Sequence, residues 1–136
     1  MGESNKTIKV LEFVVELKHY KPRIWRRIQV VDKTSLEDLS YIVMNSFNCH
    51  GSHLYQLVDI VKDKEVYYSI PNPYDNDFGM GVSQDIDKVK LNKIFKMPQD
   101  WIMLEYDFGD GWEFKIQLDK KDIPANAISL AVPGVE

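Results

Sequence analysis

Apolar and polar residues alternate along the first third of the chain. Between residues 8 and 18 every second position is apolar, which predicts a β-strand with one buried face. Pro22 interrupts this pattern, because its ring removes a backbone donor and biases Lys21 toward an extended conformation. Residues 24–31 then predict a second strand, antiparallel to the first.

A helical spacing replaces the alternation after residue 33. Apolar residues recur three or four positions apart, at Leu36, Leu39, Val43 and Phe47. This spacing predicts a helix over residues 36–47 whose apolar face packs on the sheet. The hydroxyl of Thr34 or Ser35 can cap its first turn, where Glu37 and Asp38 suit the positive end of the helix dipole.

Four further strands are predicted in the rest of the chain. Residues 53–61 and 66–70 form one pair, separated by a Lys-Asp-Lys-Glu turn. Residues 101–107 and 112–120 form another pair, and the second of these has the cleanest alternation in the chain. The loop over residues 71–87 is long for a compact domain, and residues 91–95 predict a short helical turn.

Asp110-Gly111 lies between the last two predicted strands and predicts a β-hairpin. Glycine tolerates the positive φ that such a turn needs, so we expect Gly109, Asp110 and Gly111 to shape it. Trp112 is expected to anchor the core beneath the turn.

These elements predict an α+β fold, with one main helix packed on a mostly antiparallel sheet of about five to six strands. The length of 136 residues fits a single domain over 1–136. We expect residues 1–7, and a tail over about 121–136, to be flexible or incomplete.

Composition narrows the class of protein. A hydrophobic fraction of 44% is enough for a core without metal or disulfide, and Cys49, the single cysteine, excludes an internal disulfide. The chain lacks a signal peptide and an apolar run of the roughly 20 residues that a membrane span needs. We therefore expect a soluble cytoplasmic protein.

Charge is unevenly distributed along the chain, which has a net charge of −4. Residues 1–36 carry eight Lys/Arg against four Asp/Glu, a net +4, whereas residues 75–119 carry five against ten, a net −5. The chain as a whole is not attracted to phosphate backbones, but this asymmetry leaves local binding of an anion open.

The basic strand offers one candidate site. Arg23, Trp25 and Arg27 could grip phosphate and stack on a base, which would make a nucleic-acid-binding surface. Arg26 lies on the opposite face of a strand, so the basic patch is divided. The structural alternative is that one arginine pairs with the acidic hairpin while Trp25 fills the core.

The hairpin offers a second candidate, in its four acidic residues Glu105, Asp107, Asp110 and Glu113. Close carboxylates could bind a divalent cation or perform acid–base chemistry. Alternatively, Asp110 serves the turn and the other three lie on a solvated face.

Cys49, His50 and His53 carry zinc-ligating side chains, but a structural site needs four ligands and a second pair is missing. His53 is more simply a hydrogen-bonded structural residue. We predict no metal and no cofactor.

Three blocks of sequence carry a resemblance to a known family: Lys21–Arg27, Ser52–Tyr55 and Tyr106–Trp112. Together they resemble the plasmid pRiA ORF-three-like family, also labelled insertion-element passenger TnpR-like proteins, from about Ile8 to Leu118. The resemblance implies a helix packed on a mostly antiparallel sheet. Its members are mostly uncharacterised, so it implies no substrate, and Phe114 stands where the family often has histidine.

Three functional hypotheses follow. The leading one is a non-enzymatic binding or interaction module associated with mobile elements, because the chain lacks a complete catalytic set. The second is a nucleic-acid-binding domain that uses Arg23, Trp25 and Arg27. The third is an enzyme whose site is drawn from His53, Asp107 and Asp110, which requires the three side chains to converge on one cleft.

Overall fold

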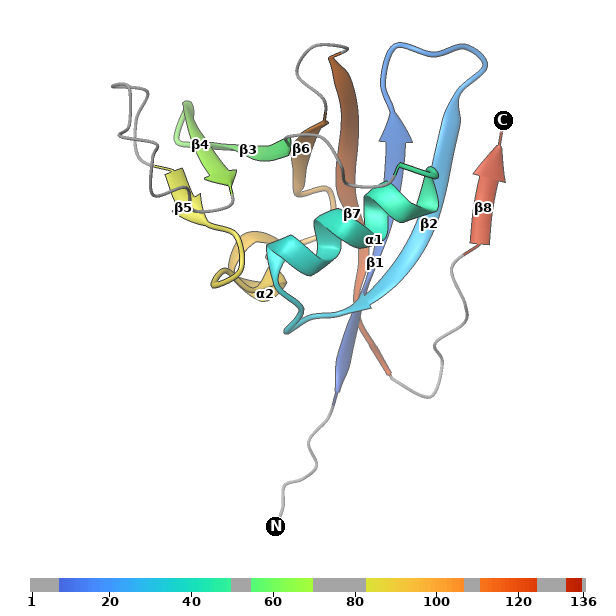
Figure 1. The fold of residues 1–136 in the computed structure, drawn as a ribbon. Coiled ribbons are helices and arrows are strands. Elements are labelled where there is room, and N and C mark those ends of the chain that lie inside the picture. The colour runs from blue at the N-terminus through green and yellow to red at the C-terminus, as the bar shows by residue number, and fades with distance from the viewer. Residues whose placement is uncertain (1–7, 50–54, 70–82, 107–110, 125–131, 136) are drawn as a thin grey trace.

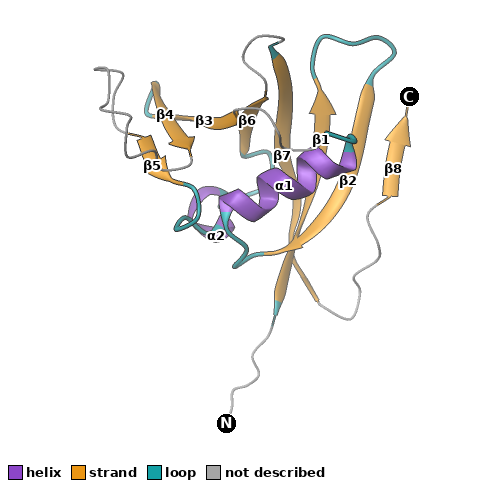
Figure 2. Ribbon diagram, viewed as in Figure 1, coloured by secondary structure: helices purple, strands orange, loops and turns teal. Residues whose placement is uncertain are grey.

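The fold was analysed in a computed structural model, which describes residues 8–49, 55–69, 83–106, 111–124 and 132–135. The elements in chain order are β1 (Lys9–Leu17), β2 (Ile24–Val31), α1 (Leu36–Ser46), β3 (Tyr55–Val61), β4 (Lys64–Ser69), β5 (Ser83–Asp85), α2 (Leu91–Ile94), β6 (Trp101–Tyr106), β7 (Trp112–Pro124) and β8 (Val132–Val135). The strands form one sheet in the order β5-β4-β3-β6-β7-β1-β2-β8 (Figures 1 and 2). Every neighbouring pair is antiparallel except β4 and β5.

The predicted α+β class is confirmed. The six predicted strands correspond to β1, β2, β3, β4, β6 and β7, and the sheet gains the short strands β5 and β8. Strands of three and four residues are too short to show an alternating pattern, so the sequence did not reveal them. Within the predicted tail over 121–136, residues 121–124 continue β7 and residues 132–135 form β8.

One face of the sheet is covered by α1, which lies across it (Figure 1). The core fills the space between them, because the alternate strand residues Phe13, Val15, Phe114 and Ile116 are fully buried there. From α1, Leu36, Leu39, Val43 and Met44 are fully buried against the same cluster. The opposite face of the sheet, which carries Glu12, Trp25, Arg27, Glu105 and Glu113, is called the open face.

The N-terminus of α1 is capped by Ser35, one of the two predicted residues. Its hydroxyl oxygen accepts a hydrogen bond of 3.1 Å from the backbone N–H of Asp38. Glu37 and Asp38 place negative charge in the first turn, as predicted. The helix ends at Ser46 with Phe47 as its C-cap, one residue earlier than the pattern indicated.

Two tight connections join strands of the sheet. Lys62 and Asp63 both have positive φ values, of 52° and 67°, and join β3 to β4 as a two-residue hairpin rather than the longer predicted turn. The predicted hairpin between β6 and β7 is confirmed, since Tyr106 pairs with Trp112. Gly111 has the expected positive φ, of 71°, whereas Gly109 and Asp110 lie outside the described residues.

Neither helix found in the described part of the chain is long and apolar enough to cross a membrane.

Substitution Ser35→Ala is expected to lower the free energy of unfolding by about 1 kcal/mol, because the first turn of α1 loses its side-chain cap. Urea denaturation followed by circular dichroism measures this change. Thr34→Ala is the matched control, since the cap bond comes from the neighbouring hydroxyl, and it is expected to change stability by less than about 0.5 kcal/mol. Equal losses in both variants would contradict the assignment of the cap.

Candidate functional site

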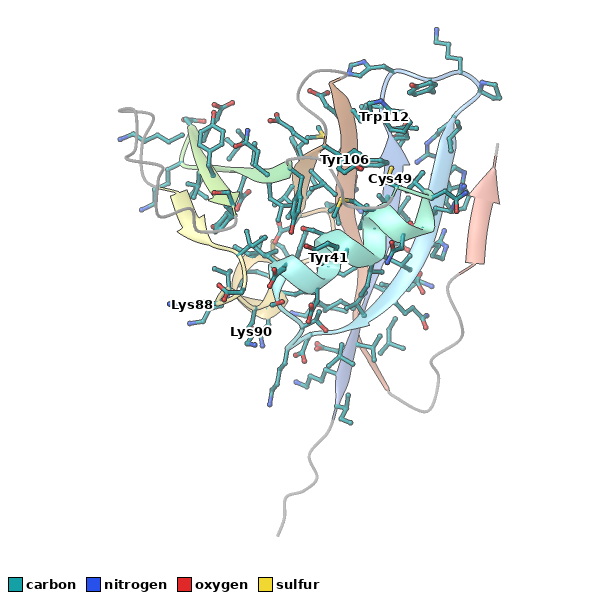
Figure 3. The ribbon with its side chains drawn as sticks, in the orientation of Figure 1. Tyr41, Cys49, Lys88, Lys90, Tyr106 and Trp112 are labelled. Atoms are coloured by element: carbon teal, nitrogen blue, oxygen red, sulfur yellow. The ribbon has the colours of Figure 1, made fainter. Side chains whose placement is uncertain are left out.

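Described residues of the three sequence blocks that carry the resemblance lie at one end of the sheet, called here the hairpin end (top of Figure 1). Tyr55, at the start of β3, pairs with Tyr106 at the end of β6, and Tyr106 pairs with Trp112 at the start of β7. The indole of Trp112 lies 6.4 Å from the ring of Tyr20, in the turn that joins β1 to β2. Figure 3 shows Tyr106 and Trp112 at this end, far from Lys88 and Lys90.

Trp112 is partly buried and packs against the core, as predicted, with its ring centroid 6.5 Å from that of Phe114. The turn between β1 and β2 is tied to the same place, because the N–H of Lys18 donates to the carbonyl of Glu113 at 2.9 Å. His19 has a φ of 73°, and its Nε2 lies 2.9 Å from Glu113 Oε1, so the ring N–H donates to that carboxylate. The hairpin end therefore joins a turn and two strand ends through contacts between distant residues.

Two carboxylates lie side by side on the open face at this end. Glu105 and Glu113 are directly opposite each other on β6 and β7, a placement that disfavours two like charges. Glu105 Oε1 accepts a hydrogen bond of 2.8 Å from the side-chain amide of Gln56. A shallow depression of about 240 Å³ is lined by Gln56, Glu105, Tyr106, Gly111, Trp112 and Glu113. Negative charge suits the binding of a cationic group, and the partly buried Trp112 lines the same depression.

On the helix side of this end, Tyr55 is buried and its ring lies edge-on to Tyr41 at 5.9 Å. Its hydroxyl lacks a hydrogen-bond partner within the described chain. Burial raises the pKa of Tyr55, so the hydroxyl stays protonated at neutral pH.

The predicted binding residues Arg23, Trp25 and Arg27 do lie together on the open face, Trp25 and Arg27 in β2 and Arg23 directly before it. The guanidinium carbons of Arg23 and Arg27 lie 5.7 Å and 5.5 Å from the centroid of the Trp25 ring. The indole of Trp25 is therefore stacked between two cations. The expectation that Trp25 fills the core was wrong, because position 25 shares its face with positions 23 and 27 rather than with the helix-facing residues.

Arg27 is the centre of an ion-pair network across three strands. Its Nη1 donates to Glu12 Oε2 on β1 at 2.8 Å and to Asp119 Oδ2 on β7 at 2.9 Å. The other oxygen of Glu12 accepts a 2.8 Å bond from Gln29 Nε2. Among the described residues, Glu12 and Asp119 are the acidic partners of Arg27. The pairing of an arginine with the acidic hairpin stays a prediction, because Asp107 and Asp110 lie outside the described residues.

Glu12 is buried, with 6% of the residue exposed, although it lies on the open face. Burial alone would raise the pKa of Glu12, but the hydrogen bonds from Gln29 and Arg27, with the charge of Arg27, outweigh it and hold the pKa below the ordinary 4.5. Asp119 reaches Arg27 because β7 has an irregularity there. Glu12 pairs with Lys120 and Phe13 with Leu118, so Asp119 is the extra residue of a bulge, which re-aims its side chain.

Arg26 points to the helix side, as predicted. Its Nε donates to the carbonyl of Ser46 at 3.2 Å, and its guanidinium lies 4.7 Å from the centroid of the Phe47 ring. A cation at this position also suits the negative end of the α1 dipole. Arg26 therefore contributes to the end of the helix rather than to a surface shared with Arg23 and Arg27.

The remaining predicted site residues, His53, Asp107 and Asp110, lie outside the described residues, as does His50. Cys49 is a buried free cysteine, and burial raises the pKa of its thiol. Across the described ranges, no group of three or more His, Cys, Asp and Glu side chains could hold a metal ion. Sequence reasoning missed Glu12 and Asp119. The only signal for them was their place on the polar side of alternating strands.

Substitution Arg27→Met is expected to lower the free energy of unfolding by about 2–3 kcal/mol, because it leaves the buried Glu12 without its charged donor. Since the pKa of Glu12 is lowered on folding, this stabilisation is present above pH 4.5 and is lost as the pH falls below it. Urea denaturation of both proteins at pH 7 and at pH 3 measures the difference.

Arg23→Met is the matched control for this measurement. Arg23 stacks on the same indole, but its ion pair with Glu16 is longer, at 3.5 Å, and the Glu16 side chain is 26% exposed against 8% for Glu12. The control is expected to cost at most about 1 kcal/mol. If the two variants lose equal stability, or if the Arg27→Met loss is independent of pH, the ion-pair network does not have the role described.

Comparison with known proteins identifies relatives of unknown function. The family model described as plasmid pRiA4b ORF-3-like protein matches residues 9–133. The uncharacterized protein y4hQ of Sinorhizobium fredii (strain NBRC 101917 / NGR234) is 26% identical over 111 residues, which are 82% of this chain and 54% of that relative. The chain thus spans about half the length of this curated relative.

A solved structure shares the fold. The crystal structure of the protein of unknown function MM3350 from Methanosarcina mazei Go1 matches with a TM-score of 0.77, covering 96% of this chain and 71% of that chain. At 24% sequence identity this likeness shows the fold alone. Because the family model covers residues 9–133 of the 136, the chain belongs to the plasmid pRiA4b ORF-3-like protein family.

Proposed function

We propose that the chain is a non-catalytic binding module that contacts another protein through the hairpin end. The observation that carries this proposal is that described residues of the family sequence blocks meet at that end, where Tyr55, Tyr106 and Trp112 are paired in register. Tyr55 and Tyr106 are buried and belong to the rigid scaffold, whereas the partly buried Trp112 and the exposed Tyr20 are the aromatic rings that a partner can reach.

The chemistry of the hairpin end favours a basic segment of the partner. Glu105 and Glu113 lie directly opposite each other, so a lysine or arginine placed between them relieves their repulsion. Tyr20, which is 47% exposed, adds an aromatic face beside Trp112 for a cation. Both features favour positive charge at the hairpin end, with Glu105 and Glu113 on the open face and Trp112 on the helix side.

The nucleic-acid alternative has less support. Arg27 donates to two carboxylates, and Arg23 pairs with a third, Glu16. A phosphate group would have to compete with these carboxylates for the same guanidinium groups. The alternative of an enzyme built on His53, Asp107 and Asp110 stays a prediction, because all three residues lie outside the described ranges.

We further propose a cytoplasmic location and an association with mobile elements. Cys49, the chain's single cysteine, is a buried thiol, which fits a reducing compartment. The family takes its name from a plasmid reading frame, which supports the second point.

The double substitution Glu105→Gln with Glu113→Gln is expected to weaken binding of an oligolysine peptide about tenfold at low salt, because two charges facing the ligand are removed. Isothermal titration calorimetry measures the affinity. The matched control neutralises two exposed carboxylates away from this end, Asp63 and Asp87, and is expected to leave the affinity unchanged. If both double variants bind equally, the hairpin end is not the binding surface.

The wild-type chain is expected not to bind a single-stranded or double-stranded oligonucleotide at about 20 mM salt, a condition that favours phosphate contacts. Fluorescence anisotropy of a labelled oligonucleotide tests this. Saturable binding that weakens steeply with salt and is abolished by Arg23→Met with Arg27→Met would instead support the nucleic-acid alternative.

A further inference from the structure

The outer edge of the sheet beside β2 is covered by the chain's own last strand. β8 pairs with β2 along Ile24–Arg27, which is the first half of this eight-residue strand (Figure 1). Along β8, Val132 lies opposite Arg27, Pro133 lies opposite Arg26 and Gly134 lies opposite Trp25. A segment of four residues therefore occupies an edge that is twice its length.

The hydrogen bonds that face β8 can be assigned from the ladder between β1 and β2. The N–H of Asp32 donates to the carbonyl of Lys9, so hydrogen-bonded pairs alternate from that point along the antiparallel register. The backbone groups of Arg26 and Ile28 then point toward β1, whereas those of Trp25 and Arg27 point toward β8. The backbone N–H and C=O groups of Trp25 and Arg27 therefore face the strand that lies along this edge.

β8 has a composition that forms strands poorly. Glycine weakens a strand through its backbone entropy, and proline lacks an N–H donor. Pro133 lies opposite Arg26, at a pair of residues that exchanges no backbone hydrogen bonds. The missing N–H of proline is therefore not needed at this position, and proline is tolerated there. Only Val132 and Gly134 can exchange backbone bonds with the edge. A short strand with two bonding residues is easily displaced from the edge that it covers.

We propose that the β2 edge is a strand-addition site, occupied in this structure by residues 132–135 and able to accept an extended acidic segment of a partner protein. Backbone bonds to Trp25 and Arg27 would hold the incoming strand, as in other cases of β-augmentation. Its residue opposite Arg26 lies on the same face as that guanidinium, and cross-strand pairs of opposite charge are favourable. An acidic residue at the position of Pro133 therefore matches the edge.

The test uses the full chain and a synthetic peptide of residues 129–136 that carries Pro133→Glu. Titration is followed by the amide NMR shifts of β2. The chain variant Gly134→Pro removes the N–H that faces Trp25 and so weakens the tethered strand, whereas Gly134→Ala keeps that N–H and is the matched control. The Gly134→Pro chain is expected to bind the peptide about tenfold more tightly than the wild-type chain, because the tethered strand no longer competes.

The peptide series tests the chemistry of the partner. The Pro133→Glu peptide is expected to bind about fivefold more tightly than one with Pro133→Lys, because only the former is complementary to Arg26. The proposal is overturned if neither peptide shifts the β2 amides, if the Gly134→Pro and wild-type chains bind equally, or if the lysine peptide binds better. Circular dichroism confirms that the variant chains are folded.

Hydrogen exchange of the wild-type chain provides a second measurement that needs no variant. The amides of Trp25 and Arg27, which face β8, are expected to exchange faster than those of Arg26 and Ile28, which face β1. Equal protection of the two sets would mean that β8 does not open, and would overturn the proposal. Both outcomes are independent of the carboxylates at the hairpin end.

Discussion

A buried carboxylate on the interior strand β1 constrains the pairing of three strands of the sheet. Glu12 is 6% exposed, and its charge is tolerated because Arg27 on β2 and Gln29 donate to it at 2.8 Å. Arg27 also bonds Asp119 on β7, so one guanidinium group spans β2, β1 and β7. A slip of one residue would turn the Arg27 side chain to the core, and a slip of two would separate it from Glu12. The network therefore favours a single register over alternatives that bury the same apolar faces.

That register decides which residues share the hairpin end. Because Leu17 is opposite both Ile24 and Phe114, the turn after β1 lies beside the start of β7. The pairing of Tyr106 with Trp112 and with Tyr55 then brings the start of β3 to the same end. The contacts of His19 and Tyr20 with Glu113 and Trp112 follow from this placement. The proposed binding surface is thus a product of strand register, which also leaves the edge of β2 to β8.

Helices and strands could be predicted from the sequence where the spacing of apolar residues stays regular over enough positions. The strands β1, β2, β6 and β7 and the helix α1 show periods of two and of three to four, and the Ser35 cap follows from side-chain chemistry. The partners of Arg27 could not be predicted. Glu12 and Asp119 are separated by more than a hundred residues in the sequence, and the bulge that aims Asp119 leaves no local pattern. Of the six predicted site residues, Arg23, Trp25 and Arg27 are together, but they serve the sheet, and His53, Asp107 and Asp110 lie outside the described ranges.

The register across β7, β1 and β2 is the central claim, and nuclear Overhauser effects between α-protons test it most directly. Glu16 with Trp25, and Leu17 with Phe114, are both pairs without mutual backbone hydrogen bonds, which bring opposite Cα atoms to about 4.5 Å. The structure predicts strong α-proton cross-peaks within both pairs. Cross-peaks from Trp25 to Val14 instead of Glu16 would show a register shifted by two residues, and would contradict the account.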